Sequence, residues 1–212
     1  MVIAIDGPAG AGKSSVARAV AGALGFTYLD SGAMYRCVAL AALEEDVDLD
    51  DPHATGKLAA SLRIAFGDGR IHLDGRDVTD AVRSPQVTAA ASRVSVHPQV
   101  REAMVSRQRA LIETGRYVAE GRDVGTVVSP DAPLKVFLTA EPEERARRRA
   151  AESGEEVGEV MEAQRERDAR DQGREHGALR PAGDAVQLDT TGLALDDVVS
   201  RVVELARKRG LA

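Results

Sequence analysis

The stretch VIAIDGPAGAGKSSVARAVAGALG, residues 2–25, predicts how the first part of this chain folds. Its first four residues are apolar and predict a short buried strand that ends at Ile5. A glycine-rich turn follows at Asp6–Gly12, and over residues 13–24 apolar side chains recur at the spacing of a buried helix face. Gly25 is expected to end that helix. The stretch therefore predicts a strand, a glycine-rich turn and a helix in direct succession.

The turn GPAGAGKS fits the pattern G-x-x-x-x-G-K-[ST], and it has the strand and the helix that this motif requires on either side. A plain turn with a stray lysine would also fit the letters, but motif, position and context agree on a bound nucleoside triphosphate. Lys13 is expected to reach the β- and γ-phosphates, and the Ser14 hydroxyl to complete a Mg²⁺ shell. The residues expected to surround the phosphates are Gly7, Pro8, Ala9, Gly10, Ala11, Gly12, Lys13, Ser14 and Ser15.

The composition limits what else the chain does. It has 212 residues, is 43% hydrophobic and carries a net charge of −6. These values predict one domain, or one domain with insertions, and they disfavour a nucleic-acid binder. Because the protein is acidic, binding of a polyanion requires positive charge concentrated at one place. The single cysteine, Cys37, excludes an internal disulfide and a thiolate zinc cluster. We read neither a leader nor a membrane-spanning run in the chain, and we expect a cytoplasmic protein.

Strands and helices alternate along most of the chain, which predicts an α/β fold with a doubly wound, five-stranded parallel sheet. In such sheets ligands bind outside the carboxyl ends of the strands. From residue 62 to 78 the pattern changes to period two broken by Asp-Gly pairs, which predicts hairpins in an inserted antiparallel lobe. After the first strand, the remaining strands are predicted at 27–29, 117–121, 134–140 and 185–191, and helices at 34–43, 98–113, 142–153 and 194–209.

The tetrapeptide GRDV occurs twice, at Gly75–Val78 and at Gly121–Val124. The first copy follows Asp74 in the period-two region, where Asp-Gly is the usual signal of a hairpin turn. The second copy directly follows a predicted buried strand and so lies at the sheet edge where ligands bind. We therefore predict that the second copy belongs to a functional site and that the first only turns the chain.

Positive side chains are concentrated after two predicted strands and in one charge-dense segment. Ser31 and Arg36 follow the second strand closely enough to grip one anion, and Arg122 with Asp123 follows a central strand. Arg36 alone would also fit an exposed helix surface, and the charge-dense segment a solvated, salt-bridged helix. In that segment the offsets of one helix face are shared by Arg167, Arg170, Asp171 and Arg174.

The clusters favour a kinase over other nucleotide-binding proteins. A GTPase of the usual kind reads guanine with Asn-Lys-x-Asp, and this chain contains no Asn. A kinase acting on a hydroxyl group needs a carboxylate base, whereas a kinase acting on a monophosphate needs arginines that bring two polyanions together. Three alternatives remain at this point: a kinase for another monophosphate, a kinase for a small alcohol, and a regulatory protein that hydrolyses ATP slowly.

The motifs resemble those of the bacterial cytidylate kinases, members of the nucleoside monophosphate kinase group. The matching segments are IDGPAGAGKSS, LDSGAMYR, AAASRVSVHPQVREAMVSRQR, EGRDVGTVVSPDAPLKVFLTA and RERDARDQGR, and they span nearly the whole chain. DSGAMYR and GRDVGTVV are specific, whereas the phosphate loop alone is not. The resemblance implies an enzyme that uses ATP and Mg²⁺ to phosphorylate CMP and dCMP, and we expect a monomer that binds these nucleotides but neither nucleic acid nor a membrane.

The same resemblance implies a role for each site residue. Asp123 resembles a residue that recognises cytosine. Its carboxylate would accept a hydrogen bond from the exocyclic amine of cytosine and would repel the carbonyl that uracil has at that ring position. Arg170 resembles a cation over the transferring phosphate. The implied ligands of the CMP phosphate are Ser31, Arg36 and Arg122; of cytosine, Ser92, Arg101 and Asp123; and of the ribose and acceptor, Arg167, Asp171 and Arg174. The implied catalytic residues are Lys13, Arg122, Arg167 and Arg170.

The resemblance also implies three parts within one kinase domain. Residues 31–97 would form the lobe that binds the monophosphate, and residues 153–176 a helical lid. The lid segment is rich in charge and poor in apolar anchors, and we expect it to be mobile without ligand and ordered when both nucleotides bind. The remaining ranges, which would form the core, are 1–30, 98–152 and 177–212.

Overall fold

The computed structural model describes residues 1–67 and 69–211, and these form two compact units. The first unit contains residues 1–30 and the chain from residue 109 onward, and the second contains residues 31–108. Asp68, which falls in the first predicted hairpin turn, and Ala212 lie outside the described residues. In the described part of the chain no helix is both long and apolar enough to cross a membrane.

The first unit is built on a five-stranded parallel sheet of order β2-β6-β1-β7-β8. β1 lies in the middle, where Ala4 pairs with Ala119 of β6 on one side and with Lys135 of β7 on the other. All five residues of β1 are buried, because a central parallel strand is covered on both faces. The predicted sheet is confirmed, with the strands β1 (Val2–Asp6), β2 (Thr27–Asp30), β6 (Tyr117–Gly121), β7 (Leu134–Thr139) and β8 (Val186–Asp189).

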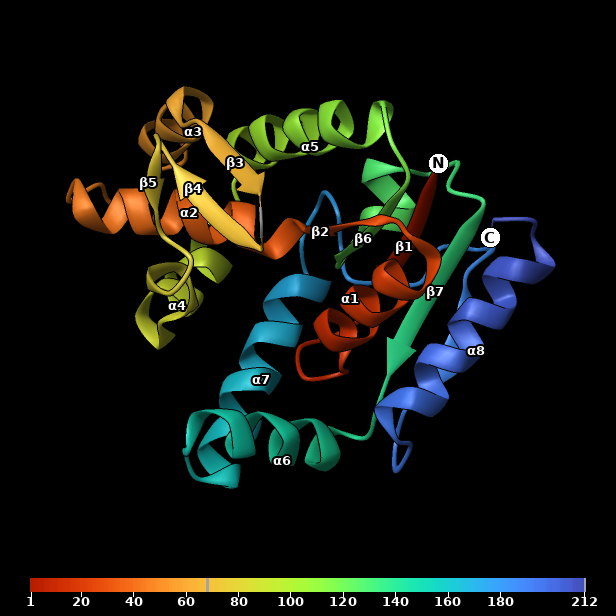
Figure 1. Ribbon diagram of the computed structural model, residues 1–212. Helices are drawn as coiled ribbons and strands as arrows, with labels where there is room; N and C mark the ends of the chain where they lie inside the picture. Colours follow the sequence, from red (N-terminus) through yellow and green to blue (C-terminus); the bar gives the residue numbers. More distant parts are fainter. Residues whose placement is uncertain (68, 212) are drawn as a thin grey trace. The chain divides into compact units, whose positions relative to one another are not determined.

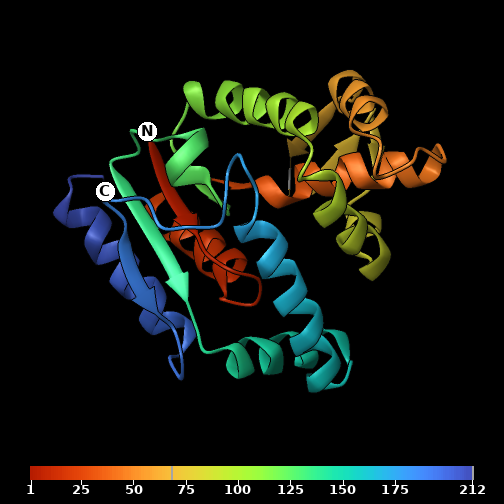
Figure 2. The same cartoon turned by 180° about the vertical axis from the view of Figure 1, so that it is seen from behind.

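Two helices cover one face of this sheet, α1 (Lys13–Leu24) and α8 (Leu195–Lys208). Figure 1 shows them side by side, and Figure 2 shows the unit from behind. Val20 of α1 and Val202 of α8 belong to one buried apolar cluster with Ile3 of β1, and burying each such side chain contributes about 1.5–3 kcal/mol. As predicted, α1 ends at Gly25, whose φ of 65° places it in the left-handed region.

Two further helices of the first unit follow β7 and pack on each other through a small apolar cluster. These are α6 (Pro142–Ser153), which has Pro142 in its first turn as predicted, and α7 (Val157–Gln172). The buried side of α7 is mostly polar, and its buried residues are Val160, Gln164, Asp168 and Asp171. An apolar periodicity therefore does not mark this helix. The prediction that Arg174 shares its face was wrong, because α7 ends at Gln172 and Gly173 caps it.

The second unit combines helices with a small antiparallel sheet of order β3-β4-β5. Asp74 and Gly75 have φ values of 51° and 87° between β4 and β5, so the hairpin turn predicted for the first GRDV copy is confirmed. α2 begins at Ser31 rather than at the predicted Met34, because Gly32 is tolerated in a first helical turn and does not delay the helix. The elements of this unit are α2 (Ser31–Glu44), α3 (Pro52–Ser61), β3 (Ile64–Gly67), β4 (Arg70–Leu73), β5 (Arg76–Asp77), η1 (Ala81–Arg83), α4 (Pro85–Val94) and the first part of α5 (Pro98–Glu113).

Candidate active site

The phosphate loop joins β1 to α1 at the carboxyl end of the central strand. Gly7 lies so close to β7 that a Cβ atom there would sit 2.2 Å from the Leu138 carbonyl oxygen, so only glycine fits. Lys13 begins α1 and is buried, and its Nζ donates to the Pro8 carbonyl at 2.6 Å. Ser14 and Ser15 are exposed at the start of the helix, where backbone N–H groups and the helix dipole favour an anion.

Cations gather around the loop within the first unit. Burial lowers the pKa of Lys13 well below its usual range, and Arg122 and Arg167 lower it in the same direction, whereas Glu120 and Asp6 oppose them. Three buried or half-buried positive side chains this close together repel one another, which costs free energy. A bound polyanion would offset that cost, so this part of the unit suits phosphate groups.

A buried carboxylate at the end of β6 faces the beginning of α1. Glu120 accepts hydrogen bonds from the Tyr28 hydroxyl and from the Ser14 side chain. Burial and the neighbouring Asp30 raise the pKa of Glu120, and Lys13 opposes them. The Ser14 hydroxyl and the Glu120 carboxylate therefore present two oxygen ligands together, which is the donor type that Mg²⁺ prefers.

A second carboxylate joins the phosphate loop to the second GRDV copy. The two oxygens of Asp6 accept from the backbone N–H groups of Val124 and Gly125 at 2.9 and 2.7 Å. These amides begin the π-helical turn η2 (Val124–Val128), directly after the buried Asp123. Burial raises the pKa of Asp6 to about 6, opposed by the two amide donors, while the charge of Asp123 raises it further. Asp6 thus holds the segment that carries Arg122 and Asp123.

The candidate residues of α7 lie around one buried ion-pair cluster. Asp171 accepts from Arg122 Nε at 2.8 Å and also pairs with Arg174. Burial raises the pKa of Asp171, but Arg122, Arg174 and Arg167 outweigh this and lower it overall. Arg170 is different, since it is exposed and approaches Glu166 at 3.8 Å. The structure therefore brings Arg122, Asp171 and Arg174 into contact and leaves Arg170 at the surface.

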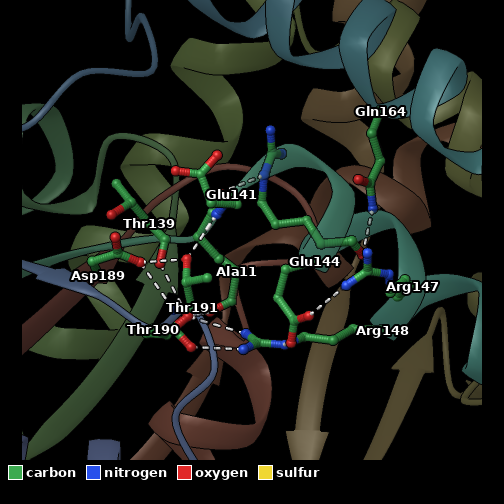
Figure 3. Close-up of polar contacts among 12 residues, drawn as sticks. Ala11, Thr139, Glu141, Glu144, Arg147, Arg148, Gln164, Asp189, Thr190 and Thr191 are labelled. Atoms are coloured by element: carbon green, nitrogen blue, oxygen red, sulfur yellow. Dashed lines mark hydrogen bonds and ion pairs between the residues drawn. The ribbon is translucent and has the colours of Figure 1, made fainter.

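The far side of the phosphate loop is covered by α6 and the segment after β8. Arg148 donates to Glu144, and its Nη1 and Nη2 reach the Thr190 hydroxyl and carbonyl at 3.0 and 2.7 Å, as Figure 3 shows. The Thr190 hydroxyl in turn lies 3.4 Å from the carbonyl oxygen of Ala11 in the loop. These contacts attach the last strand of the sheet to the loop.

The remaining predicted residues belong to the second unit. Ser31 and Arg36 lie on α2, which packs against α4, the helix that carries the buried Ser92. Arg101 of α5 is also buried, and its guanidinium lies 5.9 Å from the ring centroid of Tyr35. Within this unit the candidate residues of α2, α4 and α5 thus lie on helices that contact one another or share an aromatic contact.

Four residues of the first unit were missed by the sequence reasoning. Asp6 and Glu120 each occupy or adjoin the last position of a strand at the ligand-binding edge, and that rule alone would have singled them out. Arg145 and Asp168 form a buried ion pair between α6 and α7. No spacing signal links these two, because their pairing depends on how the helices fold back on the loop.

The sheet order, the loop and the clustered cations define a kinase of the phosphate-loop class. A gluconokinase from Sinorhizobium meliloti 1021 shares the fold, with a TM-score of 0.52 at 17% identity over 99% of this chain and 93% of that chain. The family described as cytidylate kinase matches residues 3–208. A cytidylate kinase from Solibacter usitatus is 47% identical over 99% of this chain and 93% of that protein, and one from Stutzerimonas stutzeri is 48% identical over 100% and 97%. The chain belongs to the cytidylate kinase family.

Proposed function

We propose that this protein transfers the γ-phosphate of ATP to CMP and dCMP, giving ADP with CDP or dCDP. The observation that carries the proposal is the convergence of Lys13, Arg122 and Arg167 on the phosphate loop in a chain whose net charge is −6. An acidic protein that concentrates cations at one loop is suited to hold two polyanionic nucleotides together. Membership of the cytidylate kinase family supports the monophosphate and its base.

The chemistry requires little of the protein beyond position and charge. The acceptor oxygen of a monophosphate is already ionised, so no base is needed. That oxygen attacks the γ-phosphorus in line, and the bond from phosphorus to the β–γ bridging oxygen breaks, so no covalent enzyme intermediate forms. In this proposal the charge of the transition state is offset by Lys13, Arg122 and Arg167, and Arg170, which lies at the surface in this structure, joins them when the proposed lid closes.

Binding of ATP is proposed for the loop from Gly7 to Ser15, together with Mg²⁺. Among the described residues no cluster of three or more His, Cys, Asp or Glu is placed to hold a metal, so the ion would share its ligands with the triphosphate. Ser14 and Glu120 fit that requirement, because their oxygens already meet at the start of α1. When bound, Mg²⁺ supplies positive charge to the β- and γ-phosphates.

For the recognition of CMP, the proposed residues of each unit are considered separately. In the first unit, Asp123 would accept a hydrogen bond from the cytosine amine. Arg122 would exchange its hydrogen bond to Asp171 for one to the substrate phosphate. This exchange is feasible because Asp171 keeps its pair with Arg174. The remaining proposed ligands, carried over from the sequence resemblance, are Ser31, Arg36, Ser92 and Arg101 in the second unit and Arg167, Asp171 and Arg174 in the first.

The working state of the enzyme is also part of the proposal. We propose a cytoplasmic monomer whose residues 153–176 act as a lid over the core and whose residues 31–97 form the CMP lobe. The lid is expected to gain protection from hydrogen exchange when both nucleotides bind. Equal protection of residues 153–176 with and without nucleotides would contradict the closing lid while leaving the catalytic proposal intact.

The experiment that tests the function is an initial-rate assay of ADP release with ATP and Mg²⁺. The acceptors are CMP, dCMP, UMP, AMP, GMP, shikimate and gluconate. Strong stimulation by CMP and dCMP with little by UMP is the expected result. If no acceptor raises the rate above slow ATP hydrolysis, the proposal is wrong, and preference for another acceptor would reassign the substrate.

A further inference from the structure

An ion pair from outside the phosphate loop is hydrogen-bonded to the first half of the loop. The Ala9 N–H donates to Asp168 Oδ1 at 3.3 Å, and the Ala9 carbonyl accepts from Arg145 Nη1 at 2.9 Å. The same Nη1 lies 2.5 Å from Asp168 Oδ2. Both polar groups of one loop residue are therefore bound by two oppositely charged side chains that are themselves paired.

The next residue of the loop is enclosed by the same helices. A Cβ atom on Gly10 would lie 2.9 Å from Arg145 Cβ and 2.8 Å from Gln164 Nε2. Gln164 is buried and donates to the Arg145 carbonyl at 3.3 Å. Gln164 and Asp168 are one turn apart on α7, so this helix presses two polar side chains against the loop at Ala9 and Gly10.

The pair is also tied to the sheet. Arg145 Nε donates to the carbonyl of Ala140, just after β7, at 3.2 Å. The side chains of Arg145 and Asp168 are only 10% and 11% exposed. A buried ion pair is weak evidence for stability, since apolar residues of similar volume are often as good or better. Its three backbone contacts at the loop and the strand instead suggest that it serves a geometric purpose.

We propose that Arg145 and Asp168 are positioning residues that hold the Ala9 peptide so that the loop is shaped for the phosphates of ATP. In this assignment Ala9 sets the shape of the loop through its N–H and carbonyl. Because the two residues lie on α6 and α7, the placement of these helices sets the affinity for ATP. The inference rests on the proposed function for the identity of the nucleotide, but the binding of that nucleotide is measurable without transfer to CMP.

Two changes at the pair separate loop positioning from folding. Asp168→Asn keeps an oxygen that accepts from the Ala9 N–H but loses the charge. The double change Arg145→Met with Asp168→Leu replaces the pair by apolar side chains of similar volume, so the fold is kept while every polar contact to Ala9 is lost. Glu162→Ala, an exposed position on the same helix α7, is the matched control.

The measurements are the Kd for MgADP by calorimetry, the KM values for ATP and CMP, kcat, and the thermal midpoint. For the apolar double variant we expect the Kd for MgADP and the KM for ATP to rise about tenfold, as for one or two lost hydrogen bonds, with the KM for CMP within about twofold. Asp168→Asn should recover most of the affinity, and Glu162→Ala should match the wild type.

The overturning result is a double variant that binds MgADP as tightly as the wild type, whatever happens to its midpoint. An equal rise of both KM values would also overturn the inference, because the pair would then act on the whole site rather than on the loop. If the wild type binds MgADP but phosphorylates no CMP, the proposed function fails while the positioning role remains measurable.

Discussion

The two copies of GRDV have the same four side chains in opposite surroundings. In the first copy, Arg76 is 58% exposed and pairs with Glu44, and Asp77 accepts from the backbone and hydroxyl of Thr79. In the second copy, Arg122 is 16% exposed and binds Asp171, which is itself 2% exposed. One copy turns a hairpin at the surface, and the other lies buried at the carboxyl end of β6.

The cause of the difference lies outside the tetrapeptide. The first copy follows Asp74 in the left-handed region, which forces a hairpin turn and puts its charges in water. The second copy follows a buried parallel strand, and Asp6 captures the backbone directly after it through two amides. A short motif therefore acquires a role from the strand that precedes it and from the residue that holds its backbone.

The largest expected effect comes from Arg122→Ala. The change removes the proposed charge-assisted contact to the CMP phosphate, worth about 3 kcal/mol, so kcat/KM for CMP should fall about 100-fold. Asp171 keeps Arg174 as its partner, so the fold should survive, and circular dichroism with a thermal midpoint checks this. A folded variant with near wild-type kcat/KM would remove Arg122 from the proposed site.

A smaller effect is expected on the choice of base. Asp123→Asn leaves a carbonyl for the cytosine amine and adds an amide donor for the carbonyl of uracil. The ratio of kcat/KM for CMP to that for UMP, which we expect to be about 100 in the wild type, should narrow about tenfold. An unchanged ratio would show that Asp123 does not face the base.

A still smaller effect is expected from pH, because kcat should follow the titration of Asp6. Its pKa is raised to about 6, so the carboxylate that accepts both amides is lost as the pH falls through 6, and kcat should drop about fourfold at pH 5.5. Because the pKa of Asp6 is higher in the folded state than in the unfolded chain, protonation of Asp6 stabilises the fold. Titration of Asp6 therefore lowers the activity without unfolding the protein. Saturating nucleotides are used, and the thermal midpoint is followed at each pH.

The control for this pH dependence is Asp6→Asn, which has no carboxyl group to titrate at that position. Its kcat should be low but should lack the step near pH 6. Asp123 and Lys13, whose charges act on Asp6, are unchanged in this variant. A step of full size in Asp6→Asn would assign the titration to another group, such as Lys13, Glu120 or the substrate phosphate.

The smallest effect is expected for Arg76→Ala, the counterpart of Arg122→Ala in the first copy. An exposed ion pair contributes little, so kcat/KM should stay within about twofold and the thermal midpoint within about 2 °C. Assays run in parallel on the two alanine variants make the comparison direct. Equal losses in both would overturn the distinction between the copies.

The sequence predicted those parts of the fold that carry local signals. The apolar spacing of α1, the Pro142 start of α6 and the Asp74-Gly75 turn each act within a few residues, and each is observed. Helices α3 and α4 carried a usable signal that was overlooked, since Asp51 and Ser84 cap them directly before a proline. Signals that act within a few residues of the sequence are therefore sufficient to predict these helices and this turn.

Other parts of the molecule could not be predicted because their partners are distant in the chain. Helix α7 buries Gln164, Asp168 and Asp171, and a pattern of charges gives no sign that its inner face is polar. The contact of Asp168 with Ala9 joins residues 159 positions apart. The phosphate loop was predictable from its motif, whereas the side chains that support it became visible only in three dimensions.

The middle position of β1 also determines the order in which the fold can be completed. Both neighbours of β1 in the sheet, β6 and β7, are made long after it, because residues 31–108 form a separate unit in between. Closing that excursion costs only slightly more entropy than closing a short one, but such distant pairing slows folding. β1 is thus made before both of its neighbours but is among the last strands to be secured in the sheet. The proposed binding of ATP at its carboxyl end would therefore report that the chain has finished folding.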